Sequence, residues 1–312
     1  MNTPAPESAS DSRPASPPAA AATPLIGADP LALRDDVSGK EVLIRPYRAG
    51  DRPAVRELCA DTGFLSNPID PVFQDRELFA DYLTAYYTDC EPESSFVCEM
   101  DGVVKGYIMG CRHPARQRRY EAWHNALLAV RGAWRYLFVY NKASRKFVRW
   151  IIARAPKEVP PAPRDIPHFH INLRPEARNV HTTRYLFDAL LTYMRSCGET
   201  AIFAQVVGYE KRRGVRMFQR YGFEVLNQSE VTKFRDYTDQ SIYLITIRKD
   251  LTANETLYGL DLKKAKHDGE AGGGDADMHS AKPLQGNEKA GTAGTSHLLA
   301  QLGAAMLSAA SA

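Results

Sequence analysis

The feature that most constrains the fold is a dipeptide, Asp101-Gly102, which lies between two apolar segments, Phe96–Met100 and Val103–Met109. Asp-Gly is favoured in two-residue hairpin turns, because both central residues of such a turn take positive φ angles. The two segments are therefore expected to be antiparallel neighbours in a sheet. Helix and strand patterns alternate on both sides of this hairpin, so the sequence predicts a mixed α/β sheet rather than a doubly wound parallel one.

Apolar periodicity predicts the remaining strands and helices. Strand patterns cover residues 42–45, 168–173, 200–207, 223–225 and 241–248. Helical spacing covers residues 76–88 and 182–195. Two shorter helices are expected, one after Asp51, which can cap it, and one near 215–221. Gly198 and Gly222 follow the ends of two of these helices, as glycine commonly does.

Composition separates this central part from both ends of the 312-residue chain. Residues 1–37 are rich in Pro and Ala, and residues 253–312 are rich in Gly and Ala. Neither end has enough large apolar residues to form a core. We therefore expect a disordered arm over 1–37, one folded domain over 38–252 and a flexible tail over 253–312.

A strongly cationic segment interrupts the folded domain at 112–164. Between Arg112 and Lys157 there are twelve Lys or Arg residues and one acidic residue, Glu121, although the net charge of the whole chain is only +3. Five apolar residues recur there at helical spacing: Trp123, Leu127, Val130, Trp134 and Leu137. We expect a helical insert whose apolar stripe packs on the sheet and whose cationic face is solvated.

Three other roles for the insert stay open. It could be a lid that attracts an anionic substrate, because clustered charge raises the local concentration of anions. It could contact a membrane surface or a second copy of the chain through Trp and Arg. Nucleic acid is the least favoured partner, because no DNA- or RNA-binding motif accompanies the basic residues.

Cysteine usage and hydropathy bear on the compartment. The five cysteines are scattered, with no CxxC or Cys/His cluster, which argues against a disulfide scaffold and against structural zinc. No apolar run has the length of a membrane span, and no secretory signal is recognisable. We therefore expect a cytoplasmic protein without a metal, and the oligomeric state stays open.

Two histidines are candidates for acid–base chemistry. His168 and His170 are two residues apart on a predicted strand, so both side chains should lie on the same face of the sheet. Imidazole titrates near neutral pH, so either could act as a general base, directly or through a water. The alternative is a pair of partly buried histidines bonded to nearby backbone, and the sequence does not choose between the two residues.

Four segments together resemble the GNAT acyltransferase superfamily. They are Ile44–Asp51, Phe96–Met109, His170–Arg178 and Met217–Phe223, which match the family's first strand, its hairpin, its fourth strand and its "F-Y-E-x-x-G-F" helix end, in that order. The resemblance implies a GNAT-like fold with acetyl-CoA as cosubstrate. The implied reaction is transfer of the acetyl group to a small amine. If the insert is a lid that attracts anions, this amine substrate would also carry negative charge.

The resemblance also implies where acetyl-CoA binds. Main-chain groups of Leu173 and Arg174 would pair with the pantetheine arm. The pyrophosphate would lie on the following loop and helix start, formed by Arg178, Asn179, Val180, His181, Thr182, Thr183 and Arg184. The family's loop reads Q/R-x-x-G-x-G/A, whereas here both glycines are replaced, by His181 and Thr183. This degenerate loop could crowd the close approach that glycine permits.

One further residue departs from the family pattern. Phe218 stands where the family often has a tyrosine that protonates the leaving thiolate. The acid would then be Tyr209, Tyr221 or water. These departures keep a second function open, a catalytically inactive pseudo-acetyltransferase that acts as a binding or scaffolding module through its basic insert.

Overall fold

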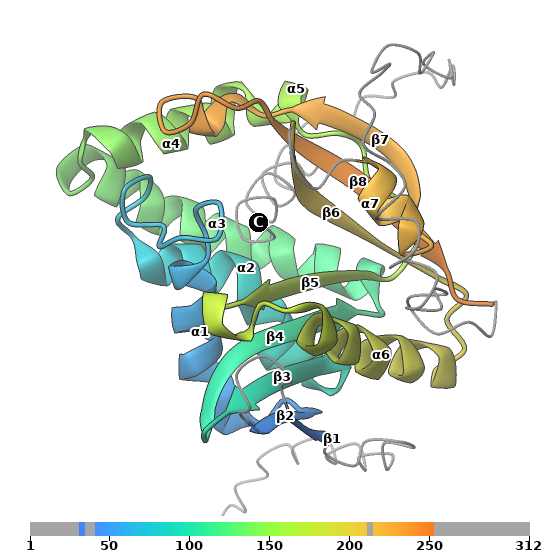
Figure 1. The fold of residues 1–312 in the computed structure, drawn as a ribbon. Coiled ribbons are helices and arrows are strands. Elements are labelled where there is room, and N and C mark those ends of the chain that lie inside the picture. The colour runs from blue at the N-terminus through green and yellow to red at the C-terminus, as the bar shows by residue number, and fades with distance from the viewer. Residues whose placement is uncertain (1–30, 35–40, 211–214, 253–312) are drawn as a thin grey trace, which may run out of the picture.

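One mixed sheet organises the molecule (Figure 1). The computed structural model describes residues 31–34, 41–210 and 215–252. The described strands are β1 (Leu31–Arg34), β2 (Glu41–Pro46), β3 (Ser95–Met100), β4 (Val103–Cys111), β5 (His168–Leu173), β6 (Ala201–Tyr209), β7 (Glu224–Glu230) and β8 (Ile242–Asp250). Their spatial order is β1-β2-β3-β4-β5-β6-β8-β7. The predicted mixed α/β class is confirmed.

Helices connect these strands and cover both faces of the sheet. The α-helices of the described chain are α1 (Arg52–Asp61), α2 (Arg76–Cys90), α3 (Pro114–Phe138), α4 (Lys142–Ala153), α5 (Ala155–Glu158), α6 (Val180–Ser196) and α7 (Val215–Arg220). Each helix predicted from periodicity is present, and the insert contributes α3, α4 and α5.

The hairpin at Asp101-Gly102 forms as its sequence predicts. Both residues have positive φ, 52° for Asp101 and 76° for Gly102. The strands on either side, β3 and β4, pair antiparallel. Antiparallel pairing continues outward from β3 to β2 and β1 and from β4 to β5, so this half of the sheet is a continuous antiparallel unit.

The second half is joined to the first by parallel strands. β5 and β6 run parallel, as expected for strands linked by a crossover helix, here α6. Their register contains one pair, His168 with Phe203. β6 instead pairs along its whole length with antiparallel β8, which also carries β7. The sheet is therefore strongly paired within each half and weakly paired between the halves.

Two apolar cores lie on opposite faces of the sheet. One joins α1, α2 and the insert through side chains such as Leu58, Phe79 and Trp150. The other joins α6 and α7 through side chains such as Leu190 and Phe218. Figure 1 shows α6 crossing one face and α1 with α2 on the other.

The insert differs from its prediction in which side of α3 is buried. Gln117, Asn125 and Leu128 are the buried residues of α3, whereas Trp123 and Trp134 are 72% and 60% exposed. The expectation that the apolar stripe packs on the sheet was wrong. The core instead takes up the apolar face of α4, including Phe147, because α4 packs against the segment before α2, where Phe73 contacts the Phe147 ring.

Two local predictions also differ from the structure. Residues 31–34, assigned to the disordered arm, form the edge strand β1; the rest of the arm and the tail over 253–312 lie outside the described residues. Asp51 precedes α1 but its side chain does not cap the helix. Its carboxylate instead accepts two hydrogen bonds from the Arg45 guanidinium, at 2.7 and 2.8 Å, because that buried cation needs a partner.

A buried carboxylate fixes the insert to α2. Asp75 is 4% exposed and caps α2 by accepting from the Leu78 amide at 3.0 Å. It also accepts from the Tyr140 hydroxyl at 2.7 Å and forms an ion pair with Arg135 at 2.6 Å. Both partners belong to the insert, so one side chain ties the start of α2 to the end of α3.

We expect Asp75→Ala to lower the free energy of unfolding by about 3 kcal/mol, because it removes a helix cap and leaves Arg135 and Tyr140 without their acceptor. Urea denaturation measures the change. The matched control is Asp70→Ala, which removes a half-exposed partner of Arg76 and should cost less than about 1 kcal/mol. Equal losses in the two variants would contradict the role given to Asp75.

Candidate functional site

The site lies where β5 and β6 separate. After the single pair at His168 and Phe203, no further register joins these two strands in the described chain. Arg174 N–H donates to the Lys105 carbonyl of β4 at 2.8 Å. Main-chain groups alternate in direction along a strand, so those of Ile171 and Leu173 face away from β4, toward the opening. The edge of β5 thus offers hydrogen-bonding groups to a ligand that enters there.

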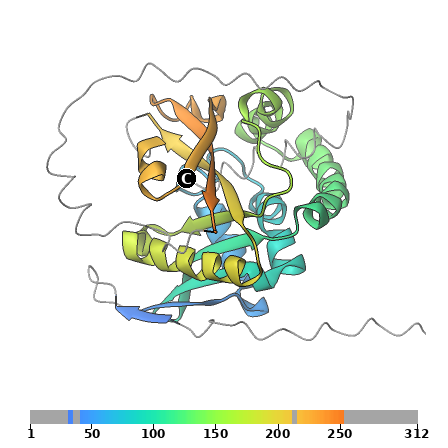
Figure 2. The ribbon, with the colours of Figure 1, turned by 90° about the vertical axis from the view of Figure 1, so that its right-hand side faces the viewer.

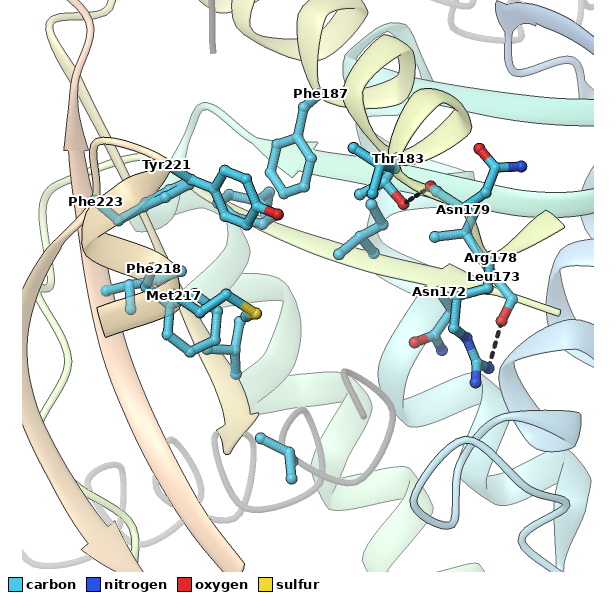
Figure 3. Close-up of a pocket in the computed structure, with 16 residues that line it drawn as sticks. Asn172, Leu173, Arg178, Asn179, Thr183, Phe187, Met217, Phe218, Tyr221 and Phe223 are labelled. Carbon is cyan, nitrogen blue, oxygen red and sulfur yellow. Dashed lines mark hydrogen bonds between the residues drawn. The ribbon is translucent and has the colours of Figure 1, made fainter. Parts of the chain in front are cut away.

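A cavity of about 330 Å³ occupies the opening (Figure 3). This volume lies in the lower part of the range typical of small-molecule sites. Its lining comprises Phe169, Ile171, Asn172, Leu173, Arg178, Asn179, Val180, Thr183, Phe187, Val206, Val207, Met217, Phe218, Tyr221, Phe223 and Ile247. In Figure 3 the polar residues Arg178 and Asn179 lie at one end of the cavity, and Phe218 and Phe223 lie at the other.

The polar end is the N-terminus of α6. Asn179 is the N-cap, and its side-chain oxygen accepts from the Thr182 amide at 2.8 Å. The amides of Val180 and His181 lie in the same first turn, where a helix offers its N–H groups no carbonyl of its own. These amides and the helix dipole make such a terminus favourable for anions. The Arg178 guanidinium adds a full positive charge and donates to the Leu173 carbonyl at 2.9 Å.

The structure places five of the nine residues expected to bind the cosubstrate at this cavity. These five are Leu173, Arg178, Asn179, Val180 and Thr183. The other four lie outside the lining. The main-chain N–H of Arg174, expected to pair with the pantetheine arm, donates to the Lys105 carbonyl instead, and its side chain forms an ion pair with Asp61 at 2.5 Å. Arg184 lies 3.5 Å from Asp188, His181 is exposed and Thr182 is buried within α6.

His181 and Thr183 occupy the two positions where the family that the sequence resembles has glycine. No residue from Arg178 to Thr183 has a positive φ, so the replacement of glycine creates no strain in the backbone. The exposed His181 side chain is not part of the cavity lining. Thr183 does line it, but its hydroxyl donates to the Asn179 carbonyl at 2.7 Å. Anion binding at this terminus would therefore fall to the amides and Arg178 rather than to threonine hydroxyls.

Most of the apolar lining was not named as a site from the sequence. Phe169 and Ile171 alternate with the two histidines along β5 and so lie on the opposite face, toward α6. Strand alternation could have found them. Phe187, Val206 and Phe223 come from three other elements, and only the tertiary fold brings these together.

Both histidines lie on the other face of β5, as their spacing predicts, and neither lines the cavity. His168 Nε2 is 2.9 Å from the Tyr87 hydroxyl. His170 is 1% exposed, its ring packs against Tyr107 at 5.5 Å between centroids, and neither of its nitrogens has a hydrogen-bond partner among the described residues. Asn172, the next residue on that face, donates to the Tyr107 hydroxyl at 3.0 Å and also reaches the cavity lining.

Burial makes both imidazoles neutral at neutral pH. It lowers the pKa of His168 to about 4 and that of His170 to about 3, with the charge of His168 a smaller cause for His170. A neutral imidazole is the form that accepts a proton. Of the two candidate acids, Tyr221 lines the cavity, whereas Tyr209 packs against the core on the other face.

The buried histidines predict a pH dependence of stability. Their folded pKa values lie below the usual 6.5, so the unfolded chain binds more protons and the free energy of unfolding falls as pH is lowered from about 6.5. We expect His170→Leu to reduce this slope between pH 6.5 and 4 by about 1.4 kcal/mol per pH unit. Urea denaturation at several pH values measures it. Phe169→Leu, a non-titrating change on the same strand, should retain the wild-type slope; an unchanged slope in His170→Leu would contradict the assignment.

No cluster of three or more His, Cys, Asp or Glu side chains that could hold a metal occurs in the part of the chain that the structure describes. Within the same residues, no helix combines the length and apolarity needed to cross a bilayer.

Comparisons with known proteins find only distant similarity. No protein-family model and no curated protein matches the sequence. Among solved structures, SsHAT is 22% identical with a TM-score of 0.44, and the match covers 68% of this chain and 99% of SsHAT. The protein yncA from Salmonella typhimurium, whose structure contains its cofactor acetyl-CoA, is 16% identical with a TM-score of 0.40, covering 69% of this chain and 97% of yncA. An N-acetyltransferase from Staphylococcus aureus Mu50 is 14% identical with a TM-score of 0.41, covering 68% and 99%.

The order and directions of the strands described above define the fold. The sheet consists of an antiparallel unit and a parallel junction that opens after one registered pair, and α6 starts at the opening. The chain has a mixed α/β fold with a basic helical insert.

Proposed function

We propose that this protein is an N-acyltransferase that transfers the acetyl group of acetyl-CoA to an amine. The observation that carries the proposal is the opening between two parallel strands, filled by a cavity whose polar end is the start of α6. An acyl-CoA has a polyanionic diphosphate, an amide-containing arm and an apolar thioester end. The cavity offers a complementary group for each of these parts.

The residues that would hold the donor follow from the lining. The diphosphate would lie at the first turn of α6, near the amides of Val180 and His181 and the Arg178 guanidinium. The amide-containing arm would pair with the edge of β5 at Ile171 and Leu173, in the manner of an added strand. Apolar side chains such as Phe218 would exclude water from the remaining part of the cavity.

The transfer joins the acceptor nitrogen to the acetyl carbon and releases coenzyme A as the thiol. The acceptor loses a proton and the sulfur gains one. The chain would contribute chiefly by positioning the two substrates, since holding reactants in place removes much of the entropic barrier. Tyr221 is the better placed of the candidate acids, because it lines the cavity.

For the base we propose the pair His168 and His170. A buried imidazole with two unpartnered nitrogens is costly, and such groups often mark a catalytic role or a water site. His170 meets this description. His168, on the same face of β5, lies within hydrogen-bond distance of the Tyr87 hydroxyl. Both rings are neutral at neutral pH and so have a lone pair for the proton, although the burial that keeps them neutral also lowers their basicity.

Coenzyme A binding tests the donor site. We expect acetyl-CoA at a hundred times its Kd to stabilise the chain by about 2.7 kcal/mol, seen as a higher melting temperature. Arg178→Ala should weaken binding by about 1.5–3 kcal/mol, because Arg178 would make charged hydrogen bonds to phosphate. Titration calorimetry measures the difference.

The control is Arg184→Ala, which makes the same charge change on α6 outside the cavity lining and should leave the affinity nearly unchanged. An absence of any thermal shift with acetyl-CoA would overturn the donor site and favour the inactive scaffolding module instead.

Kinetics of His168→Ala and His170→Ala test the base. We expect the variant of the acting base to lose about 10²- to 10⁴-fold in kcat, with an unchanged KM for acetyl-CoA. Thiol release with a panel of amines measures both constants. Because the base is already neutral above pH 5, the wild-type rate should show no loss from histidine protonation between pH 5 and 8. Full activity in both variants would remove the pair from the mechanism.

A further inference from the structure

The insert presents an apolar stripe to solvent along the whole of α3. We call α3 stripe the five exposed apolar residues, Trp123, Leu127, Val130, Trp134 and Leu137, together with the two exposed arginines that precede them, Arg116 and Arg119; each lies three or four residues after the one before. Exposed fractions reach 73% for Val130 and 72% for Trp123. Single exposed apolar residues are ordinary, but a continuous row of five, two of them Trp, marks an interaction surface.

The exposure of this stripe is built into the fold. The opposite side of α3 is held against α2, where Arg131 lies 3.2 Å from Asp81 and Arg135 lies 2.6 Å from the buried Asp75. Leu128, on that inner side, belongs to the core. Since these contacts fix the rotation of the helix, the α3 stripe faces outward at the edge of the molecule, as Figure 2 shows for the helix itself.

The charges around the stripe select the chemistry of its partner. Arg116 and Arg119 begin it, and Lys142, four residues beyond the end of α3, is also exposed. The acidic residue of α3, Glu121, lies outside the stripe and accepts a hydrogen bond from the buried Gln117 at 2.8 Å. A second copy of the chain would bring two such cationic segments together, which costs free energy. The surface therefore fits an anionic partner with an apolar interior.

We propose that α3 lies flat on membranes that contain anionic phospholipids. Trp123 and Trp134 would lie at the level of the headgroups, with Leu127, Val130 and Leu137 between acyl chains. Arg116 and Arg119 would contact lipid phosphates. The stripe is about 32 Å long at 1.5 Å per residue, so the helix can lie along the surface while its other side remains packed on the domain.

This contact is independent of the proposed transferase activity. It needs α3 and its attachment to α2, but no residue of the cavity between β5 and β6. Failure of acetyl-CoA binding would therefore leave it standing, and failure of membrane binding would leave the donor site standing.

Vesicle binding by the full chain tests the proposal. We expect co-sedimentation with vesicles of phosphatidylcholine and phosphatidylserine, much weaker binding to phosphatidylcholine alone, and loss of binding as salt is raised. Tryptophan fluorescence should shift to the blue on binding, because Trp123 and Trp134 leave water while Trp150 is already buried.

Two pairs of variants separate the apolar and the charged contributions. Trp123→Ser with Trp134→Ser should abolish binding, whereas Val103→Ser, which removes an exposed apolar residue from β4, should not change it. Arg116→Gln with Arg119→Gln should weaken binding about 25-fold, at about fivefold per charge. Arg48→Gln with Arg248→Gln makes the same change in net charge elsewhere and should have little effect. All of these positions are solvent-accessible, so thermal melts should confirm that each variant folds.

Three results would overturn the proposal. The first is no binding to phosphatidylserine vesicles at low salt. The second is equal binding by the Arg116→Gln/Arg119→Gln variant and its charge-matched control. The third is a different partner: a dimer in light scattering that the double Trp variant disperses, or binding of a single-stranded oligonucleotide, in either case without vesicle binding.

Discussion

The arrangement of the candidate site depends on how unevenly the sheet is paired. β5 is bonded along its length to β4, and β6 along its length to β8, yet β5 and β6 share one registered pair. Strand pairing is therefore extensive within each half of the sheet and sparse at the junction between the halves. The separation exposes the edge of β5 and the start of α6 at the same place. A strand edge and a helix terminus both carry N–H groups that need partners, so this junction is where the molecule can bind a ligand with main-chain groups.

The two faces of β5 carry different kinds of side chain. On one face Phe169 and Ile171 line the cavity with the aromatic residues of α6 and α7. On the other, His168 and His170 lie among tyrosines from α2 and β4. Asn172 belongs to the histidine face and still reaches the cavity, because it stands near the end of the strand where the sheet opens. Under the proposed function, the donor would occupy one side of the strand and the acceptor would approach from the other.

The insert shows how ion pairs to a buried carboxylate can determine an exposed surface. Asp75 and Asp81 hold Arg131 and Arg135 toward α2, which leaves the opposite side of α3 to solvent. Arg131 and Arg135 thus lie on the inner side of the helix and Trp123 and Trp134 on its outer side, the reverse of the usual amphipathic arrangement. The apolar core of this region comes instead from α4, where Phe147 and Trp150 are buried.

Sequence alone determined the features that depend on local chemistry. The Asp101-Gly102 turn predicted the hairpin because few dipeptides accept two positive φ angles, and periodicity predicted α2, α6 and β5 because a packed face must repeat with its helix or strand. Alternation placed His168 and His170 together for the same reason. Only the tertiary structure decided which face of α3 is buried, that β5 and β6 separate after one pair, and that His181 lies outside the cavity while Thr183 lines it. These outcomes depend on contacts between segments far apart in the chain, such as Asp75 with Arg135, and no local pattern records which partner a side chain will meet.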